Sequence, residues 1–227
     1  MLREDIESGA YLPGNQIPTE RELSKKLSVS TITVKQAIQK LVNEGFLNRR
    51  QGKGTYVSQL RVQRKLTGLI SFHDEMLQRG FVPSTRLLDL RVIPARRVVT
   101  EALQLPENAK VLSINRLRLA DGEVMAVQRS YLPYDLCPGL ADNPDSLMGS
   151  LYKVLRQNYN LEPVRGRETY EAVAVIGHDA HILGVPEGSV AFSVKRYAYM
   201  IDNRAIEYVE SLLRADRYAL NVELPGE

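Results

Sequence analysis

Residues 18–57, PTERELSKKLSVSTITVKQAIQKLVNEGFLNRRQGKGTYV, decide the fold of the first part of the chain. Thr19 and Glu22 have the spacing of a capping box, which satisfies the exposed amides at a helix start. A polar break at residues 28–30 separates this helix from a second one, for which Ser30 is a suitable cap. The stretch therefore predicts two helices across a tight turn.

The second helix has one apolar face and one polar face. Its apolar residues recur at i, i+3, i+4, i+7 and i+8, the spacing of a buried stripe: Val34, Ala37, Ile38, Leu41 and Val42. Gly45 is expected to end it, because glycine adopts positive φ without strain. The outer face carries donors and cations: Thr31, Thr33, Lys35, Gln36 and Lys40. In a helix-turn-helix such residues reach base edges and phosphates, although a solvated helix face has the same composition.

A basic β-hairpin follows the second helix. Residues 46–50 and 55–57 read as strands, and the turn between them contains Gly52, Lys53 and Gly54. The glycines keep the tip thin, so Lys53 can approach a phosphate or a minor groove. A charged hairpin alone is common. Two helices followed by this hairpin favour a winged helix-turn-helix that binds DNA.

The charge distribution supports this interpretation. Residues 1–66 contain 12 Lys+Arg against 6 Asp+Glu, whereas the whole 227-residue chain has a net charge of only +3. The basic excess lies on the segment that carries the motif, as expected for a nucleic-acid-binding domain. The remainder of the chain is net acidic and is expected to have another task.

Composition excludes several classes of protein. The chain is 44% apolar and 25% charged, which is typical of one or two soluble globular domains. Its single cysteine, Cys137, cannot form an internal disulfide or a zinc ribbon. No apolar run approaches 18 residues, and no signal-peptide pattern begins the chain. We therefore expect a cytoplasmic protein that does not contact a membrane.

The rest of the chain predicts an α+β domain. Residues 1–9 read as a helix, and residues 58–67 as a linker or, equally, an extension of the wing strand. A helix is expected over 68–80, with Leu69, Phe72, Met76 and Leu77 on one face and Gly80 as its stop. Strands are expected over 87–99, 110–122, 123–133, 165–175, 189–203 and 204–224, with short helices near 99–105, 145–159 and 178–185. Hairpin turns at 121–122 and 202–203 make the sheet mainly antiparallel, with helices expected on its other side.

Catalytic and metal-binding signatures are weak. His178 and His181 are three residues apart in an expected helix, but no third ligand accompanies them. Cys137 has no neighbouring histidine to activate it and reads as a buried spectator thiol. No P-loop, G-x-S-x-G or G-x-G-x-x-G motif is present. We predict no catalytic residue, no metal site and no cofactor.

The stronger lead is a pair of arginines in the second domain. Strand alternation places Arg116 and Arg118 on one face, which Leu112 and Ile114 continue. Burying two guanidinium groups is costly unless an anion pairs with them. A phosphate or carboxylate ligand fits, because arginine binds such groups in a forked geometry. An exposed face, or salt bridges to an internal acid such as Glu168, would fit equally well.

The first domain resembles the winged helix-turn-helix of the GntR family of bacterial transcription regulators. The matching stretches are 18–23, 29–35, 41–45 and 50–57. The resemblance implies DNA contacts from the first helix, the start of the recognition helix and the wing. With the outer-face residues these are Arg21, Thr31, Thr33, Lys35, Gln36, Arg50, Lys53 and Gly54. The family usually has arginine at the positions of Thr31 and Lys35, so the operator sequence does not carry over. Members normally have a longer first helix, and we expect this chain to begin inside it.

The second domain resembles the effector-sensing UTRA domain of the HutC subfamily, which is similar in fold to chorismate lyase. The matching stretches are 72–76, 114–120, 129–133, 183–188 and 214–218. A member of this subfamily that represses amino-sugar utilisation senses amino-sugar phosphates. Its phosphate-binding positions fall on Thr85, Arg116, Arg118 and Ser150, and Ser150 opens a helix that includes Tyr152. Its sugar-binding acids fall on Glu207 and on Gln128, where this chain has an amide.

These resemblances imply a ligand-responsive regulator, most simply a repressor. The expected domains are a winged helix-turn-helix at 1–57, a linker at 58–67 and an effector-binding and dimerisation domain at 68–227. The expected partners are double-stranded operator DNA, a small anionic effector such as a sugar phosphate or carboxylate, and a second copy of the chain. The alternatives are an enzyme on a chorismate-lyase-like fold tethered to DNA, and a non-specific nucleic-acid binder with a dimerisation domain.

Overall fold

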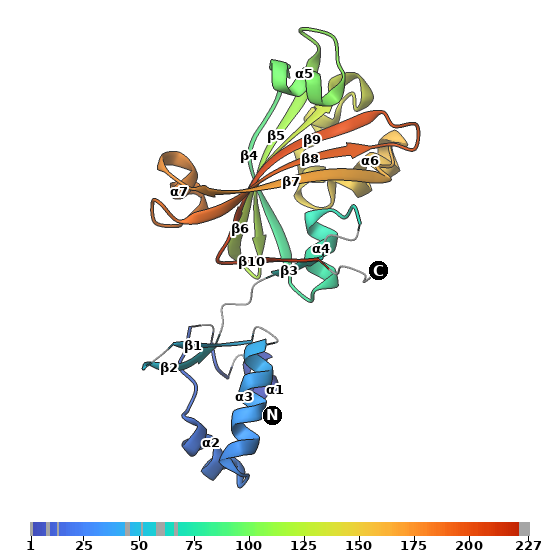
Figure 1. Cartoon of the computed structure of the whole chain (residues 1–227). Helices are drawn as coiled ribbons and strands as arrows, with labels where there is room; N and C mark the ends of the chain where they lie inside the picture. Colours follow the sequence, from blue (N-terminus) through green and yellow to red (C-terminus); the bar gives the residue numbers. More distant parts are fainter. Residues whose placement is uncertain are drawn as a thin grey trace, which may run out of the picture. The chain divides into compact units, whose positions relative to one another are not determined.

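The structure, a computed structural model, describes residues 2–7, 10–12, 14–43, 46–50, 52–57, 62–65 and 68–222. The chain forms two compact units, residues 1–63 and 64–227 (Figure 1). The finer domain boundaries expected from the sequence remain a prediction, and part of the expected linker, residues 62–65, is strand.

The described residues of the first unit form three helices and a hairpin. The helices are α1 (Leu2–Glu7), α2 (Glu20–Leu27) and α3 (Thr31–Asn43), and the strands are β1 (Leu47–Arg50) and β2 (Gly54–Val57). Thr19 and Glu22 form the predicted capping box at the start of α2. The strands pair antiparallel, with Arg50 opposite Gly54. The predicted helix-turn-helix and wing are both confirmed; Gly45, the expected end of α3, lies outside the described residues.

The apolar stripe of α3 forms the centre of this unit's core. Val34, Ile38 and Leu41 are buried together with Leu23 of α2. Ala37, which the spacing placed in the stripe, is exposed. The buried stripe turns the other side of α3 toward solvent.

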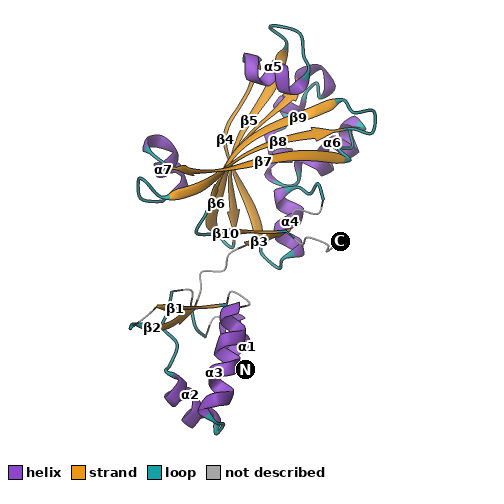
Figure 2. Cartoon of the chain, viewed as in Figure 1, coloured by secondary structure: helices purple, strands orange, loops and turns teal. Residues whose placement is uncertain are grey.

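The second unit is built on a six-stranded sheet (Figure 2). Its strands are β4 (Pro83–Pro94), β5 (Lys110–Ala120), β6 (Glu123–Pro133), β7 (Arg165–Ala174), β8 (Val190–Tyr199) and β9 (Ala205–Arg214). The order is β4-β5-β6-β9-β8-β7, and every neighbouring pair is antiparallel. Separately, β3 (Val62–Lys65) and β10 (Tyr218–Asn221) form a two-stranded sheet. The α+β prediction and both predicted hairpin turns are confirmed.

Helices cover both faces of the six-stranded sheet, which corrects the one-sided arrangement expected from the sequence. They are α4 (Phe72–Gln78), α5 (Arg97–Leu103), α6 (Leu151–Tyr159) and α7 (Gly177–Leu183), with 3-10 turns at Tyr134–Leu136, Leu140–Asp142 and Pro144–Met148. Val111 and Leu112 are neighbours on β5 and therefore point to opposite faces. Val111 packs with Val99 of α5, and Leu112 packs with Leu155 of α6. Both faces of β5 carry buried apolar residues, so both require a cover.

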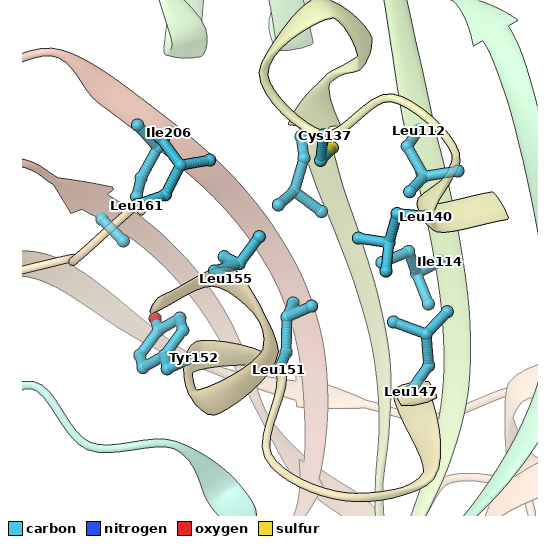
Figure 3. Close-up of a cluster of buried hydrophobic side chains, with 12 residues drawn as sticks. Leu112, Ile114, Cys137, Leu140, Leu147, Leu151, Tyr152, Leu155, Leu161 and Ile206 are labelled. Carbon is cyan, nitrogen blue, oxygen red and sulfur yellow. The ribbon is translucent and has the colours of Figure 1, made fainter. Parts of the chain in front are cut away.

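The cluster under α6 positions one wall of the candidate site. Leu151, Tyr152 and Leu155 of α6 belong to one apolar core cluster with Leu112 and Ile114 of β5 (Figure 3). This packing fixes the face of α6 that lies against the sheet. On α4, by contrast, Leu77 is 54% exposed, although the sequence placed it on that helix's apolar face.

Candidate DNA-binding surface and anion pocket

The outer face of α3 is exposed and begins with an ordered cap. The Ser30 hydroxyl accepts a hydrogen bond from the Thr33 amide at 3.1 Å and lies 2.8 Å from the Thr33 hydroxyl. The predicted contact residues on this face all reach solvent: Thr31, Thr33, Lys35 and Gln36. The structure thus gathers these side chains on the first two turns of one helix, with donors and a cation directed outward.

The wing tip is held by a residue that sequence reasoning missed. The Gln16 side-chain amide donates to the Lys53 carbonyl at 3.1 Å, and Gln16 forms an isolated β-bridge with Tyr56. Gly54 has φ +117°, and a Cβ added there would lie 2.4 Å from the Gln16 side chain. The positive φ favours glycine at this turn, and a larger residue would also displace the Gln16 side chain; Lys53 is exposed at the tip.

Two further arginines of the first unit, Arg21 and Arg50, are among the predicted DNA contacts. Arg21, in the first turn of α2, is exposed as predicted. The Arg50 side chain lies outside the described residues. Arg49, its neighbour on β1, forms a 2.8 Å salt bridge with Glu20. Ile32 at the start of α3 is 68% exposed, and it is a second residue that the charge-based reading overlooked. An apolar side chain there suits contact with a thymine methyl group.

The second candidate site is buried beneath α4 and α6. Arg116 and Arg118 of β5 are only 3% and 2% exposed, so they lie in the interior. They line a small pocket whose other polar lining residues are Ser71, Gln128, Tyr152, Arg196 and Glu207. Of the seven predicted effector-binding residues, five line this pocket. Thr85 pairs with Arg118 across the β4–β5 ladder, and Ser150 precedes α6 directly.

The two arginines are incompletely paired. Arg116 donates from Nη2 to the Gln128 side-chain oxygen at 3.1 Å and to the Ser130 hydroxyl at 3.4 Å. Within the described part of the chain, Nε and Nη1 of both Arg116 and Arg118 are buried without a hydrogen-bond partner, as is the Thr85 hydroxyl. Burial lowers the pKa of Arg116, and burial together with the neighbouring Arg116 charge lowers that of Arg118 well below its usual range.

A third arginine in the pocket, Arg196, has a carboxylate partner, and its pKa shifts in the opposite direction. Arg196 of β8 donates to the Glu168 carboxylate and, at 3.1 Å, to the Ile70 carbonyl. Burial opposes its charge, yet Tyr152 and Glu168 raise its pKa above the usual value. The Tyr152 hydroxyl donates to Glu207 at 2.9 Å. The sequence left open a salt bridge between the two strand arginines and Glu168. Glu168 pairs with Arg196 instead, so Arg116 and Arg118 lack that partner.

Ser150 is engaged within the protein. Its hydroxyl donates to the Asp74 carboxylate at 2.9 Å and lies 3.1 Å from the Ser71 hydroxyl. It also caps α6 by accepting from the Lys153 amide. The sequence placed Ser150 at an anion site but did not identify Ser71 or Asp74, which lie more than 70 residues away in the chain.

The Cys137 thiol and the possible metal ligands are the groups that could carry other chemistry. Burial raises the pKa of the Cys137 thiol to about 11, so it is protonated at neutral pH. Over the described residues, no group of three or more potential ligands could hold a metal ion. In the same part of the chain, no helix is long and apolar enough to cross a membrane.

Comparison with known proteins assigns both units. Residues 1–57 match the family described as bacterial regulatory proteins, gntR family, and residues 78–219 match the UTRA domain. The chain is 34% identical to the HTH-type transcriptional repressor NagR of Bacillus subtilis (strain 168), over 96% of this chain and 88% of that protein. It is 29% identical to a probable fructoselysine utilization operon transcriptional repressor of Escherichia coli O157:H7, over 98% and 90% of the two chains.

A solved structure extends the match to the whole fold. The crystal structure of PhnF from Mycobacterium smegmatis superposes with a TM-score of 0.88, at 26% identity, and covers 100% of this chain and 98% of that one. The matched family is one of regulatory proteins, and the two relatives compared by sequence are named as transcriptional repressors, so the enzyme alternative is not supported. The chain belongs to the GntR family of bacterial regulatory proteins, carries a UTRA domain as its second unit, and is a sequence-specific transcription regulator.

Proposed function

We propose that this regulator is a repressor of the HutC subfamily that is released from, or rearranged on, its operator by a small anionic metabolite bound at Arg116 and Arg118. The observation that carries the proposal is the set of buried guanidinium donors at these two residues that have no hydrogen-bond partner among the described residues. A sugar phosphate is the favoured ligand.

The energetics favour an anionic ligand. Each buried donor without a partner costs about 1–3 kcal/mol, and more when the group is charged. A phosphate offers acceptors to both guanidinium groups and cancels their mutual repulsion, which neither Gln128 nor Ser130 can do. Thr85 adds a buried hydroxyl on the strand beside Arg118. Carboxylates have the same forked geometry, so the chemical class is a small phosphorylated or carboxylated molecule.

The remaining polar groups suit a hydroxylated body. Gln128, Tyr152 and Glu207 line the same pocket and offer donors and acceptors to sugar hydroxyls. Because Arg116 has only donors, the Gln128 oxygen faces it, and the Gln128 amide nitrogen is left as a donor. The name of the fructoselysine relative also favours a sugar-derived ligand.

We assign operator contact to the exposed face of the first unit. Thr31, Thr33, Lys35 and Gln36 would enter the major groove, and Arg21, Arg50, Lys53 and the Gly54 backbone would contact phosphates or the minor groove. A homodimer formed through residues 68–227 would match a near-palindromic operator with half-sites about 34–36 Å apart, or a multiple of that distance. The ligand must then bind the DNA-competent and DNA-incompetent forms with different affinity. Such a regulator acts in the cytoplasm, where its operator lies.

A thermal-shift screen tests the ligand class. The full chain is heated with inorganic phosphate, with glucose 6-phosphate and fructose 6-phosphate, and with the unphosphorylated sugars, all at equal ionic strength. We expect stabilisation by phosphorylated compounds only, and its loss in Arg116→Met. Arg91→Met is the matched control, because Arg91 is an exposed arginine on β4 paired with Asp89. Equal stabilisation of the Arg116→Met variant would contradict the proposed site.

A further inference from the structure

An internal carboxylate lies where two helices of the second unit begin. Ser71 is the N-cap of α4 and Ser150 is the N-cap of α6. Both hydroxyls donate to the same oxygen of Asp74, from Ser71 at 2.6 Å and from Ser150 at 2.9 Å. Ser71 and Ser150 are 7% and 5% exposed, so this junction is largely closed to solvent. Asp74 therefore occupies a position that is rich in donors suited to an anion.

Helix capping explains only part of this arrangement. A serine at the N-cap and an acid three residues later form a common local pair, which accounts for Ser71 and Asp74. It does not account for Ser150, which comes from another helix 76 residues further along the chain. Ser150 already caps α6 through the Lys153 amide, and its own proton is directed to Asp74.

Arg118 lines the same pocket as Ser71. The Arg118 guanidinium stacks 4.6 Å from the ring of Phe72, the residue next to Ser71. Ser71, Phe72 and Arg118 line one pocket. Asp74 is among the acids whose negative charge partly offsets the lowering of the Arg118 pKa. Nevertheless, Nε and Nη1 of Arg118 are buried without a hydrogen-bond partner among the described residues. The carboxylate is near enough to act electrostatically but does not pair with the arginine.

We propose that Asp74 holds part of the anion position in the ligand-free protein, so that an anionic effector binds in competition with its carboxylate. This inference rests on the proposed anion site at Arg116 and Arg118. The effector's anionic group takes the Ser150 hydroxyl from Asp74 and supplies the partner that Arg118 lacks. Asp74 is then an affinity-setting residue: its charge repels the ligand, and its hydrogen bonds must be given up.

Asp74→Asn separates the charge from the hydrogen bonds. Asparagine keeps an oxygen that can accept from Ser71 and Ser150, so the caps of α4 and α6 are retained. Loss of a like charge within several ångströms of a bound anion is expected to tighten binding about tenfold. Asp89→Asn is the matched control, because it removes the same charge from a partly exposed residue of β4 that is paired with Arg91 and does not line the pocket.

The test is calorimetric titration of the full chain with inorganic phosphate at constant ionic strength. We expect Asp74→Asn to bind phosphate about tenfold more tightly than the wild type, Asp89→Asn to match the wild type, and Ser150→Ala to bind more weakly. Unchanged or weaker binding by Asp74→Asn would overturn the inference. Ser150→Ala that binds as the wild type does would also overturn it.

The Arg118→Met variant distinguishes a failure of the inference about Asp74 from a failure of the proposed anion site. Suppose that Arg118→Met loses phosphate binding while Asp74→Asn binds phosphate no more tightly than the wild type. The anion site is then supported, and the proposed role of Asp74 is wrong. If Arg118→Met binds phosphate as well as the wild type does, the anion site itself is wrong, and the competition falls with it. Absence of phosphate binding in both the wild type and Asp74→Asn would likewise overturn both.

Discussion

The outer face of α3 and the inner face of β5 both carry cations, but in opposite environments. Lys35 is exposed to water, which solvates it whether or not DNA is present. Arg116 and Arg118 are nearly inaccessible and retain unpaired donors. A solvated cation supplies affinity by releasing counterions, whereas a buried and unpaired one makes the protein's own stability depend on a ligand. The first arrangement suits a long polyanion, and the second suits a small anion that can be enclosed.

The largest expected effect comes from a substitution in the buried arginine pair. Arg118→Met keeps the approximate length of the side chain and removes a charge that lacks a partner. We expect the ligand-free protein to be as stable as the wild type or more so, because a buried unpaired charge is lost. Stabilisation by phosphate should vanish; at a concentration 100 times Kd that is about 2.7 kcal/mol. Thermal melts with and without phosphate measure both effects, and a variant destabilised without ligand would count against an unpaired arginine.

The wing provides the next largest effect. Gly54→Ala places a Cβ against Gln16 at a backbone angle that favours glycine, so we expect a loss of about 1–3 kcal/mol from the first unit. Gly52→Ala is the control, because a Cβ there meets nothing within 4 Å, although its φ is also positive. Chemical denaturation of both variants gives the difference. Equal losses would show that the Gln16 contact does not constrain the wing.

Lys35→Ala tests the solvent-exposed cation on the outer face of α3. We expect about a tenfold weaker complex with a duplex that the wild type selects from a random pool, and a salt dependence reduced by about one counterion. Phosphate binding should not change. Lys195→Ala makes the same charge change in the second unit, on β8 beside Glu171, and should leave the affinity for DNA unchanged. Fluorescence anisotropy at several salt concentrations supplies the slope; an unaltered slope would remove Lys35 from the contact surface.

The smallest effect concerns Thr85. Thr85→Val preserves the shape of the side chain and removes its buried, unpartnered hydroxyl. We expect phosphate binding to weaken several-fold, equivalent to about 0.5–1.5 kcal/mol, with no loss of stability. Calorimetry can resolve such a change. Wild-type affinity in this variant would place the anion away from β4.

Local patterns explain why much of the fold could be predicted. The capping box of α2 and the buried Val34 and Ile38 of α3 depend on spacings of three and four residues. The shared face of Arg116 and Arg118 depends only on the two-residue period of a strand. Those spacings are visible without knowing which elements meet. Burial of both Val111 and Leu112 is not, because the cover of each face comes from a separate helix, and hence the sheet was expected to be covered on one side only.

Long-range contacts explain what could not be predicted at the sites. Gln16 reaches the wing by a β-bridge to Tyr56, and Asp74 meets Ser150 across 76 residues. Glu168 was a possible partner for the strand arginines, but the register of β7 and β8 places it directly opposite Arg196. Sequence alternation defines a face, but strand register and helix docking decide which charges share it. The unpaired state of Arg118 therefore became visible only in the folded chain.

The most direct test of the central claim is a release titration. Labelled operator bound to the full chain is titrated with the sugar phosphate that gives the largest thermal shift, for the wild type and for Arg116→Met. Fluorescence anisotropy should fall for the wild type, whereas Arg116→Met should bind the same DNA with unchanged affinity and remain bound throughout. Release of Arg116→Met at the wild-type ligand concentration would contradict control of DNA binding by the buried arginine pair.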